Sequence, residues 1–127
     1  MSNGRILVTD DQEDNRRILL DLLSAAGFEV VEASTGEDGV AMAEAHPPDL
    51  ILMDIQLPGI DGLEATRRIK ANPALTHVPV FAVTSFALSG DEAKALAAGC
   101  DGYIAKPYSP RALLQRVRDT LAKKEAP

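Results

Sequence analysis

The stretch Asp49-Leu50-Ile51-Leu52-Met53-Asp54 contains the most clearly buried run of this sequence. Its four consecutive apolar residues are typical of a short strand that is covered on both faces, as in a parallel sheet. The Pro58-Gly59 and Asp61-Gly62 pairs that follow indicate a loop, so the strand ends near Asp54. Open α/β sheets bind their ligands at the carboxyl ends of their strands. Asp54 is therefore a candidate functional residue, although an aspartate that starts a loop or caps a helix also fits this position.

A second apolar run ends in the same way. Ile6-Leu7-Val8 is followed, after one threonine, by Asp10-Asp11. If these two strands are neighbours in a sheet, three carboxylates converge, and like charges at close range raise one another's pKa. Such an acidic cluster calls for a cation, or for a function, that compensates for the repulsion.

The rest of the sequence predicts strands and helices in strict alternation, five of each. The strands are expected over residues 5–9, 29–33, 49–53, 78–83 and 101–105. The helices are expected over 14–26, from the Ser34-Thr35 cap to about 46, from 62 to the Asn72-Pro73 break, from a capping box at Ser89 to Gly99, and over 110–123. This alternation favours an α/β fold with a parallel sheet covered by helices on both faces. Right-handed crossovers leave few topologies, and the doubly wound order 2-1-3-4-5 puts the two acid-bearing strands side by side.

Helical periodicity separates the expected core from the expected surface. In the first helix, the residues expected to face the sheet are Ile18, Leu19, Leu22 and Leu23. In the third helix, the residues expected to form a solvated face are Arg67, Arg68 and Lys70. Cys100 lies in an Ala/Gly stretch and is expected to be an inert core thiol.

Length and charge limit the possible functions. The 127 residues fit one domain, 1–127, with a core over about 5–123. A net charge of −6 argues against direct binding of nucleic acid, which requires a basic face. No segment approaches the roughly 20 apolar residues of a membrane helix. The sequence therefore predicts a cytoplasmic protein whose partners are proteins or cations.

The ends of the predicted strands carry complementary chemistry. Two acids follow the first strand and one follows the third, whereas Thr84 ends the fourth and Lys106 follows the fifth. Mg²⁺ prefers one or two carboxylates together with carbonyl, water and phosphate oxygens. A lysine and a hydroxyl are suited to hold a phosphoryl group. The set indicates phosphoryl transfer assisted by a divalent cation.

With these residues in place, the chain resembles the receiver domain of two-component response regulators, from Ile6 to about Leu121. The matching pieces are Asp10-Asp11, Asp54, the Pro58–Gly62 loop, Thr84 and Lys106-Pro107. Residues 83–92 and Gly99-Cys100 look closest to single-domain cell-cycle regulators and to receivers of hybrid kinases. The resemblance implies a flavodoxin-like fold and transfer of a phosphoryl group to Asp54 from a histidine kinase or phosphotransfer protein, with Mg²⁺ required.

The resemblance also implies a metal site. Asp11 would bind Mg²⁺ directly and Asp10 would bind it through water. Asp54 and the backbone carbonyl of Gln56 would complete the protein ligands.

Around the phosphoryl group, the resemblance makes Asp54 the nucleophile. Lys106 would pair with one phosphoryl oxygen, Thr84 would donate a hydrogen bond to another, and the Ser85 hydroxyl would lie beside the site. In the family, the residue at Thr84 then moves toward the phosphate, and the space is taken by an aromatic residue, here Tyr103. The face made by the fourth helix, the fifth strand and the fifth helix would repack for a downstream protein target. This is a switch or phosphorelay component rather than an enzyme, catalysing only its own phosphorylation and slow dephosphorylation.

Three alternatives stay open. A Mg²⁺-dependent phosphatase of the haloacid-dehalogenase type also forms an aspartyl phosphate, but that family carries its two acids as Asp-x-Asp after one strand, with an inserted cap. The chain could also be a receiver cut from a hybrid histidine kinase. An adaptor that uses only its helix faces is the third alternative.

Overall fold

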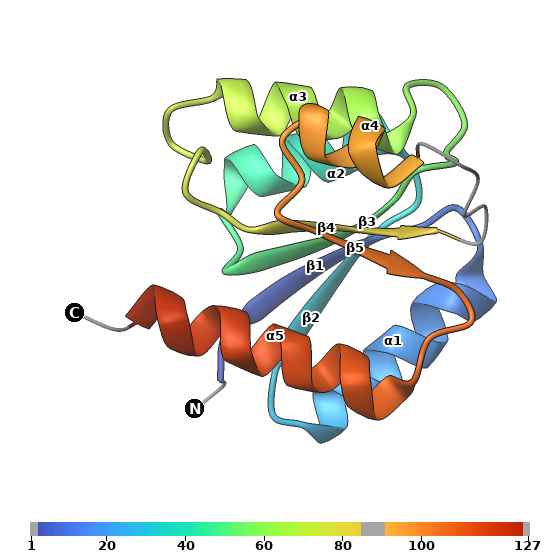
Figure 1. Cartoon of the computed structure of the whole chain (residues 1–127), viewed down its shortest axis with the longest axis vertical. Helices are drawn as coiled ribbons and strands as arrows, with labels where there is room; N and C mark the ends of the chain where they lie inside the picture. Colours follow the sequence, from blue (N-terminus) through green and yellow to red (C-terminus); the bar gives the residue numbers. More distant parts are fainter. Residues whose placement is uncertain (1–2, 85–90, 126–127) are drawn as a thin grey trace.

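The computed structural model describes residues 3–84 and 91–125. It contains a five-stranded parallel sheet in the order β2-β1-β3-β4-β5, so the predicted topology is confirmed. The strands are β1 (Arg5–Thr9), β2 (Glu29–Ala33), β3 (Leu50–Asp54), β4 (Val80–Thr84) and β5 (Gly102–Ala105). Figure 1 shows α1 and α5 on one face of this sheet and α2, α3 and α4 on the other.

The helices begin and end within a few residues of the predicted positions. They are α1 (Glu13–Ala25), α2 (Gly36–Ala45), α3 (Gly62–Ala71), α4 (Asp91–Ala97) and α5 (Pro110–Glu125). The expected cap of α2 is confirmed, because Thr35 Oγ1 accepts a hydrogen bond from Asp38 N (3.0 Å). Ser109 Oγ accepts a similar bond from Ala112 N (3.2 Å) at the start of α5. The capping box expected at Ser89 lies outside the described residues.

Strand β3 is the centre of the molecule, and all five of its residues are buried. Its alternate side chains enter two separate apolar layers, as period-two geometry requires. Leu50 and Leu52 pack toward α1 and α5, whereas Ile51 and Met53 pack toward α2, α3 and α4. The prediction that this strand is covered on both faces is therefore confirmed.

The expectation for Ile18 was wrong, because its side chain is 55% exposed. Leu19 and Leu23 are buried, and Leu22 packs partly against the same core. Successive residues of a helix are about 100° apart, so Ile18 lies at the margin of a stripe centred on Leu19 and Leu23. The face of α1 that packs against the core is therefore narrower than the four-residue apolar pattern predicts.

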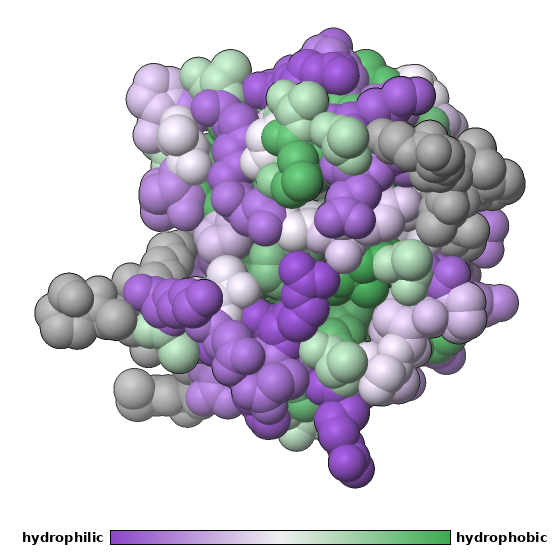
Figure 2. All heavy atoms as spheres, viewed as in Figure 1, coloured by the Kyte–Doolittle hydropathy of each residue, from purple (hydrophilic) through white to green (hydrophobic). Residues whose placement is uncertain are grey.

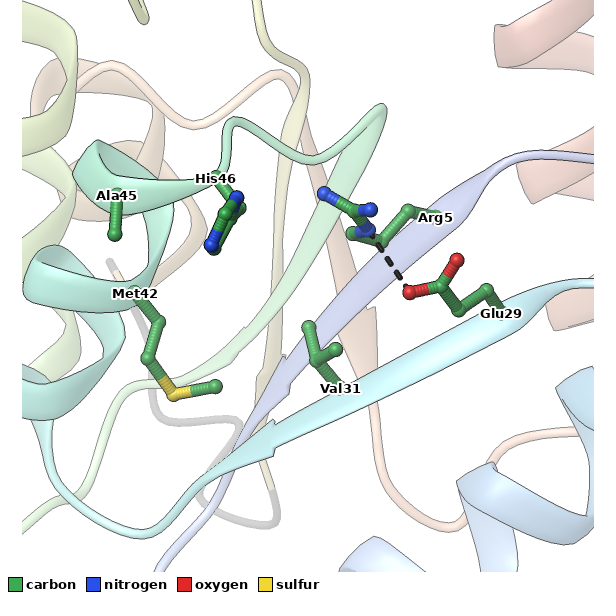
Figure 3. A pocket seen from close by; sticks show the side chains of 6 residues that line it. All are labelled: Arg5, Glu29, Val31, Met42, Ala45 and His46. Carbon is green, nitrogen blue, oxygen red and sulfur yellow. Dashed lines mark hydrogen bonds and ion pairs between the residues drawn. The ribbon is translucent and has the colours of Figure 1, made fainter.

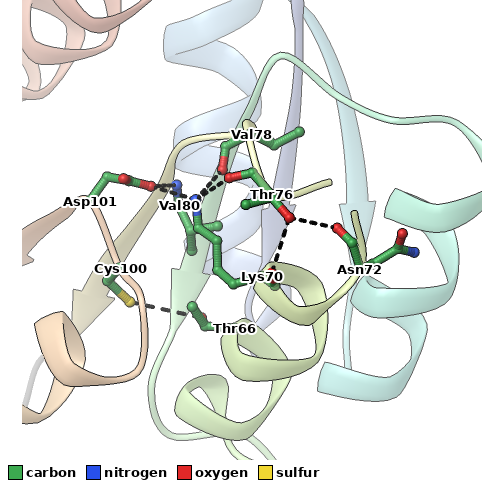
Figure 4. Close-up of polar contacts among 8 residues, drawn as sticks. All are labelled: Thr66, Lys70, Asn72, Thr76, Val78, Val80, Cys100 and Asp101. Atoms are coloured by element: carbon green, nitrogen blue, oxygen red, sulfur yellow. Dashed lines mark hydrogen bonds and ion pairs between the residues drawn. The ribbon is translucent and has the colours of Figure 1, made fainter. Parts of the chain in front are cut away.

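The expectation for Lys70 was also wrong, whereas Arg67 and Arg68 are exposed as predicted. The Lys70 side chain is only 18% exposed, and its Nζ donates to Val78 O (2.7 Å), Asp101 Oδ2 (2.9 Å) and Thr76 O (3.3 Å). Figure 4 shows the amine directed into the α3–β4 connection. Lys70 thus links α3 to the α3–β4 loop and to the loop before β5. These contacts cannot be recognised from its position in the sequence.

We expect Lys70→Met to lower the free energy of unfolding by about 2 kcal/mol, because charged hydrogen bonds that are partly buried contribute more than exposed ion pairs. Asp101 Oδ2 also accepts from Val80 N (2.8 Å), so its carboxylate would lose its cation but keep one donor. Urea denaturation measures the change. The matched control is Arg67→Met on the same helix, whose exposed pair with Glu64 predicts a change of about 0.5 kcal/mol or less. Equal losses in both variants would contradict the role of Lys70.

The surface in the view of Figure 1 is mixed in character. Figure 2 shows hydrophilic residues over much of α5 and apolar residues around α4 and between the two helices. Leu96 of α4 is 51% exposed. Within residues 3–84 and 91–125, none of the helices combines the length and the apolar composition needed to cross a membrane.

Candidate functional site

The carboxyl ends of four strands place the predicted site residues at one edge of the sheet. Asp10 follows β1 and Asp54 ends β3, and these two strands pair with Thr9 opposite Met53. Thr84 ends β4 beside β3. Lys106 follows β5, and its backbone N donates to the backbone oxygen of Thr84 (2.7 Å). Parallel pairing thus gathers groups that are far apart in the sequence.

Three carboxylates meet at this edge. One oxygen each from Asp10, Asp11 and Asp54 lies within 4.8 Å of the others. Asp10 is 3% exposed and Asp54 is 8% exposed, whereas Asp11 is at the surface. Lys106 Nζ lies 3.0 Å from Asp10 Oδ2 and 3.7 Å from Asp54 Oδ2, so the amine partly neutralises the two buried acids.

The electrostatics of Asp54 reflect this crowding. Its pKa is raised to about 6, mainly by burial of the carboxylate and further by the negative charge of Asp10. Lys106 and the backbone hydrogen bond from Gln56 N to Asp54 Oδ1 (3.1 Å) oppose the rise. The site therefore favours a group that brings positive charge next to Asp54. Oxygen ligands with an exposed acid on the solvent side fit a hard divalent cation.

The segment that follows β3 packs closely against the backbone of Asp54. Gly62 N donates to Ile55 O (2.8 Å), and a Cβ on Gly62 would lie 2.0 Å from the backbone oxygen of Asp54. Asp61 Oδ1 accepts from Glu64 N (2.8 Å) and so caps α3. The first turn of α3 thus rests directly on the backbone of Asp54.

Only some of the residues expected to contact a phosphoryl group lie within the described part of the chain. Thr84 is buried and Lys106 is directed at the acids, whereas Ser85 lies outside the described residues. The Lys106-Pro107 bond is cis. Tyr103 is half-buried, and its hydroxyl, although buried, has no hydrogen-bond partner in the described part of the chain. Burial, followed by the charges of Asp91 and Glu92, raises the pKa of this phenol.

The sequence assigned no role to two residues beside the acids. Arg16 Nη1 donates to the backbone oxygen of Asp10 (2.8 Å). Tyr108 has a raised pKa, mainly from burial and also from the charge of Asp10. In the sequence, Arg16 stands out only as a positively charged residue shortly after the Asp10-Asp11 pair. A solvent-exposed residue in the first turn of a helix gives the same pattern.

The structure also contains a pocket of about 350 Å³ away from these groups. Figure 3 shows Met42 and His46 of the α2 end facing Val31 and the Arg5–Glu29 ion pair (3.1 Å). Arg5 and Glu29 are the first residues of their strands, so this pocket lies at the opposite edge of the sheet from the acids. Its arginine is already paired, and it lacks the convergent acids and amine found at the other edge. The acidic edge is therefore the candidate functional site.

Comparison with known proteins agrees with this geometry. The response regulator receiver domain model matches residues 6–118. The polar-differentiation response regulator DivK of Brucella ovis is 40% identical over 116 residues, which cover 91% of this chain and 94% of that protein.

Two solved structures share the fold at high similarity. The receiver domain of a sensor histidine kinase from Pseudomonas aeruginosa PAO1 has a TM-score of 0.89 and 34% identity, covering 95% of this chain and 99% of that one. That receiver holds a magnesium ion in its active site cleft. The signal receiver domain of a histidine kinase from Syntrophus aciditrophicus has a TM-score of 0.91 and 27% identity, covering 98% of this chain and 94% of that one.

Proposed function

Since the chain belongs to the response regulator receiver family, we propose that Asp54 is its phosphoryl acceptor and that residues 1–127 act as one phosphorylation-dependent switch domain. The observation that carries this proposal is the convergence of three groups from separate strands. Asp54 lies close to Asp10 and Asp11, and the Lys106 amine contacts both Asp54 and Asp10. This arrangement provides a nucleophile, a place for a cation and a counter-charge for a transferred anion.

The proposed reaction transfers one phosphoryl group. A carboxylate oxygen of Asp54 attacks phosphorus, the P–N bond to the donor histidine breaks, and the imidazole nitrogen keeps the electron pair. Lys106 leaves its acid partners to pair with a phosphoryl oxygen, and Thr84 donates a hydrogen bond to another. Both side chains would stabilise the negative charge of the phosphoryl group from fixed positions. The chain therefore supplies orientation and electrostatic stabilisation, and it is modified once instead of turning over a substrate repeatedly.

The donor set fits Mg²⁺ as the resident cofactor. Asp11 and Asp54 would bind it directly, Asp10 through water, and the backbone carbonyl of Gln56 would add an oxygen. When bound, the ion neutralises the acids and the incoming phosphoryl oxygens. The raised pKa of Asp54 supports this assignment, because the site without a cation disfavours the ionised nucleophile.

Phosphorylation would change how the α4–β5–α5 face binds a downstream protein target. An aspartyl phosphate carries about −1.5 to −2 charges, where the free carboxylate of Asp54 carries a single negative charge. Thr84 would move toward these charges, and Tyr103, whose buried hydroxyl makes no hydrogen bond in the described part of the chain, would move into the space. The exposed Leu96 and the apolar residues between α4 and α5 would change their arrangement with it. The proposed partners are a histidine kinase or phosphotransfer protein upstream and a protein target downstream, in the cytoplasm.

Intact mass spectrometry after incubation with acetyl phosphate and Mg²⁺ tests this function. We expect one phosphoryl group on the wild type, none on Asp54→Asn, and none on the wild type in EDTA. Asp21→Asn, an exposed aspartate of α1, is the matched control and should be labelled like the wild type. Labelling of Asp54→Asn would refute the assignment.

The same preparation separates the switch from the phosphatase alternative. A haloacid-dehalogenase-type enzyme would release phosphate continuously from a small phosphoester, whereas a receiver is labelled once per chain. Here the two acids of the pair are adjacent and the proposed nucleophile ends β3, an arrangement that favours the receiver. The second alternative, a receiver that works within a histidine kinase, is supported by the similarity to the receivers of two such kinases.

A further inference from the structure

Arg16 connects three elements beside the acidic edge. From α1, its Nη1 donates to the backbone oxygen of Asp10 (2.8 Å), and its Nε pairs with Glu32 Oε1 (3.2 Å) on the edge strand β2. The Arg16 side chain is only 17% exposed, unlike that of its neighbour Arg17, which is 70% exposed. A planar guanidinium held at two points is a rigid link.

Asp10 is held by a hydrogen bond at each of its polar atoms. Its backbone N donates to Ala33 O (3.1 Å), and its Oδ1 accepts from Gln12 N (2.9 Å). Its Oδ2 accepts from Lys106 Nζ (3.0 Å), and its backbone oxygen accepts from Arg16. A phosphoryl group that engages Lys106 would remove the third of these contacts. The bond from Arg16 remains, and it acts on the peptide that joins Asp10 to Asp11.

We propose that Arg16 is a positioning residue of the metal site. By fixing the carbonyl of Asp10, it sets the plane of the Asp10–Asp11 peptide, so that both carboxylates face Asp54 within 4.8 Å. This inference rests on the proposed function, since it assigns a role within the same cation site. Residues that orient metal ligands without touching the metal typically account for about 10–100-fold in metal affinity.

The direction in which the Mg²⁺ affinity changes when Arg16 is replaced distinguishes a positioning role from a simple effect of its charge. Arg16 is a cation close to a cation site, and like charges repel, so its charge alone weakens Mg²⁺ binding. Removing the charge alone would make Mg²⁺ bind more tightly. Loss of positioning would make it bind more weakly, so the two roles of Arg16 predict opposite signs.

Isothermal titration with Mg²⁺ alone, without a phosphoryl donor, measures this sign. We expect Arg16→Met to raise the Kd about 10-fold and Arg16→Lys to raise it less, because lysine can replace one of the two contacts. Arg17→Met, on the same helix and in an exposed ion pair with Glu13, is the control and should change the Kd less than about 2-fold. Glu32→Gln keeps the bond between Arg16 and Asp10 and should change the Kd less than about 3-fold.

The phosphorylation rate with acetyl phosphate, measured against Mg²⁺ concentration, gives a second readout. For Arg16→Met the curve should shift to higher Mg²⁺ and reach a maximum near that of the wild type. An unchanged or lower Kd in folded Arg16→Met would overturn the inference. If that variant does not fold, an unchanged Kd in Arg16→Lys would do so. Failure of the proposed function looks different, because wild-type protein would then bind Mg²⁺ without being phosphorylated.

Discussion

Gly62→Ala should lower the free energy of unfolding by about 3 kcal/mol and slow the phosphorylation of Asp54 about 100-fold. The reason is contact between the first turn of α3 and the backbone of Asp54, the proposed acceptor. A Cβ at position 62 would lie 2.0 Å from the Asp54 backbone oxygen, and 2.8 Å from both the Asp54 carbonyl carbon and Ile55 Cα. All three are backbone atoms, so no side-chain rotation can relieve the overlap.

The overlap could be relieved in two ways, and both damage the site. Either α3 moves away and loses the hydrogen bond from Gly62 N to Ile55 O, or the Asp54–Ile55 peptide moves toward the opposite side. The second movement displaces Asp54, the proposed nucleophile, relative to Lys106 and the other acids. A displacement of about 1 Å at reacting atoms can reduce a rate about 100-fold.

Gly36→Ala provides a matched control, since Gly36 is likewise the first residue of a helix. Its added Cβ would meet Ile60 Cγ1 at 2.8 Å and Ile60 O at 2.9 Å, contacts that are longer and partly with a side chain that can rotate. We expect a loss of about 1 kcal/mol and an unchanged phosphorylation rate. Urea denaturation and mass spectrometry measure both quantities. If Gly62→Ala behaves like Gly36→Ala, the close contact is not required for the geometry of Asp54.

Local patterns predicted the strands, and general rules of α/β topology then gave the strand order and the acidic cluster. Buried strands leave little choice of face, and parallel pairing brings their ends together, so Asp10, Asp11 and Asp54 could be placed before the structure was known. The acids, the hydroxyl and the amine at four of the strand ends indicated the chemistry without any tertiary information. Thr84 and Lys106, chosen for the same reason, lie at the same edge as the acids.

The features that the sequence did not reveal depend on contacts between distant segments. Lys70 resembles an exposed helix residue until Val78 and Asp101 are placed around it. Arg16 resembles a solvated first-turn residue until β2 brings Glu32 beside it. The contact between α3 and the backbone of the acceptor strand depends on the angle at which the helix meets the sheet. Local propensity carries no information on such angles.

We also expect Asp54→Asn to raise the free energy of unfolding by about 2–3 kcal/mol at about pH 7.5 in the absence of divalent cations. The fold raises the pKa of Asp54 from 3.8 to about 6, so the folded state binds the proton more tightly than the unfolded state. The contribution of this proton to stability is fully present below the unfolded pKa of 3.8. It is lost as the pH rises through about 6, and above that the buried carboxylate opposes folding.

The pH dependence of the stability difference between the wild type and Asp54→Asn tests whether ionisation of Asp54 causes this difference. The asparagine side chain of the variant does not titrate, so its advantage should fall to about half near pH 5 and stay nearly constant above about pH 7. Measuring denaturation of both proteins from about pH 5 to about pH 8 in EDTA gives this curve. Asp21→Asn, which removes an exposed carboxylate from α1, should change stability by about 0.5 kcal/mol or less.

Addition of Mg²⁺ should reduce the stability difference between Asp54→Asn and the wild type at about pH 7.5, because binding to the folded state alone stabilises it by mass action. The ion also offsets the charge of the three acids in the wild type. Asp54→Asn retains Asp10 and Asp11 but lacks one anionic ligand, so it should gain less. If the wild type and Asp54→Asn are equally stable at every pH in EDTA, burial of Asp54 does not disfavour its ionised form. The electrostatics of Asp54 would then not favour a cation at this edge of the sheet.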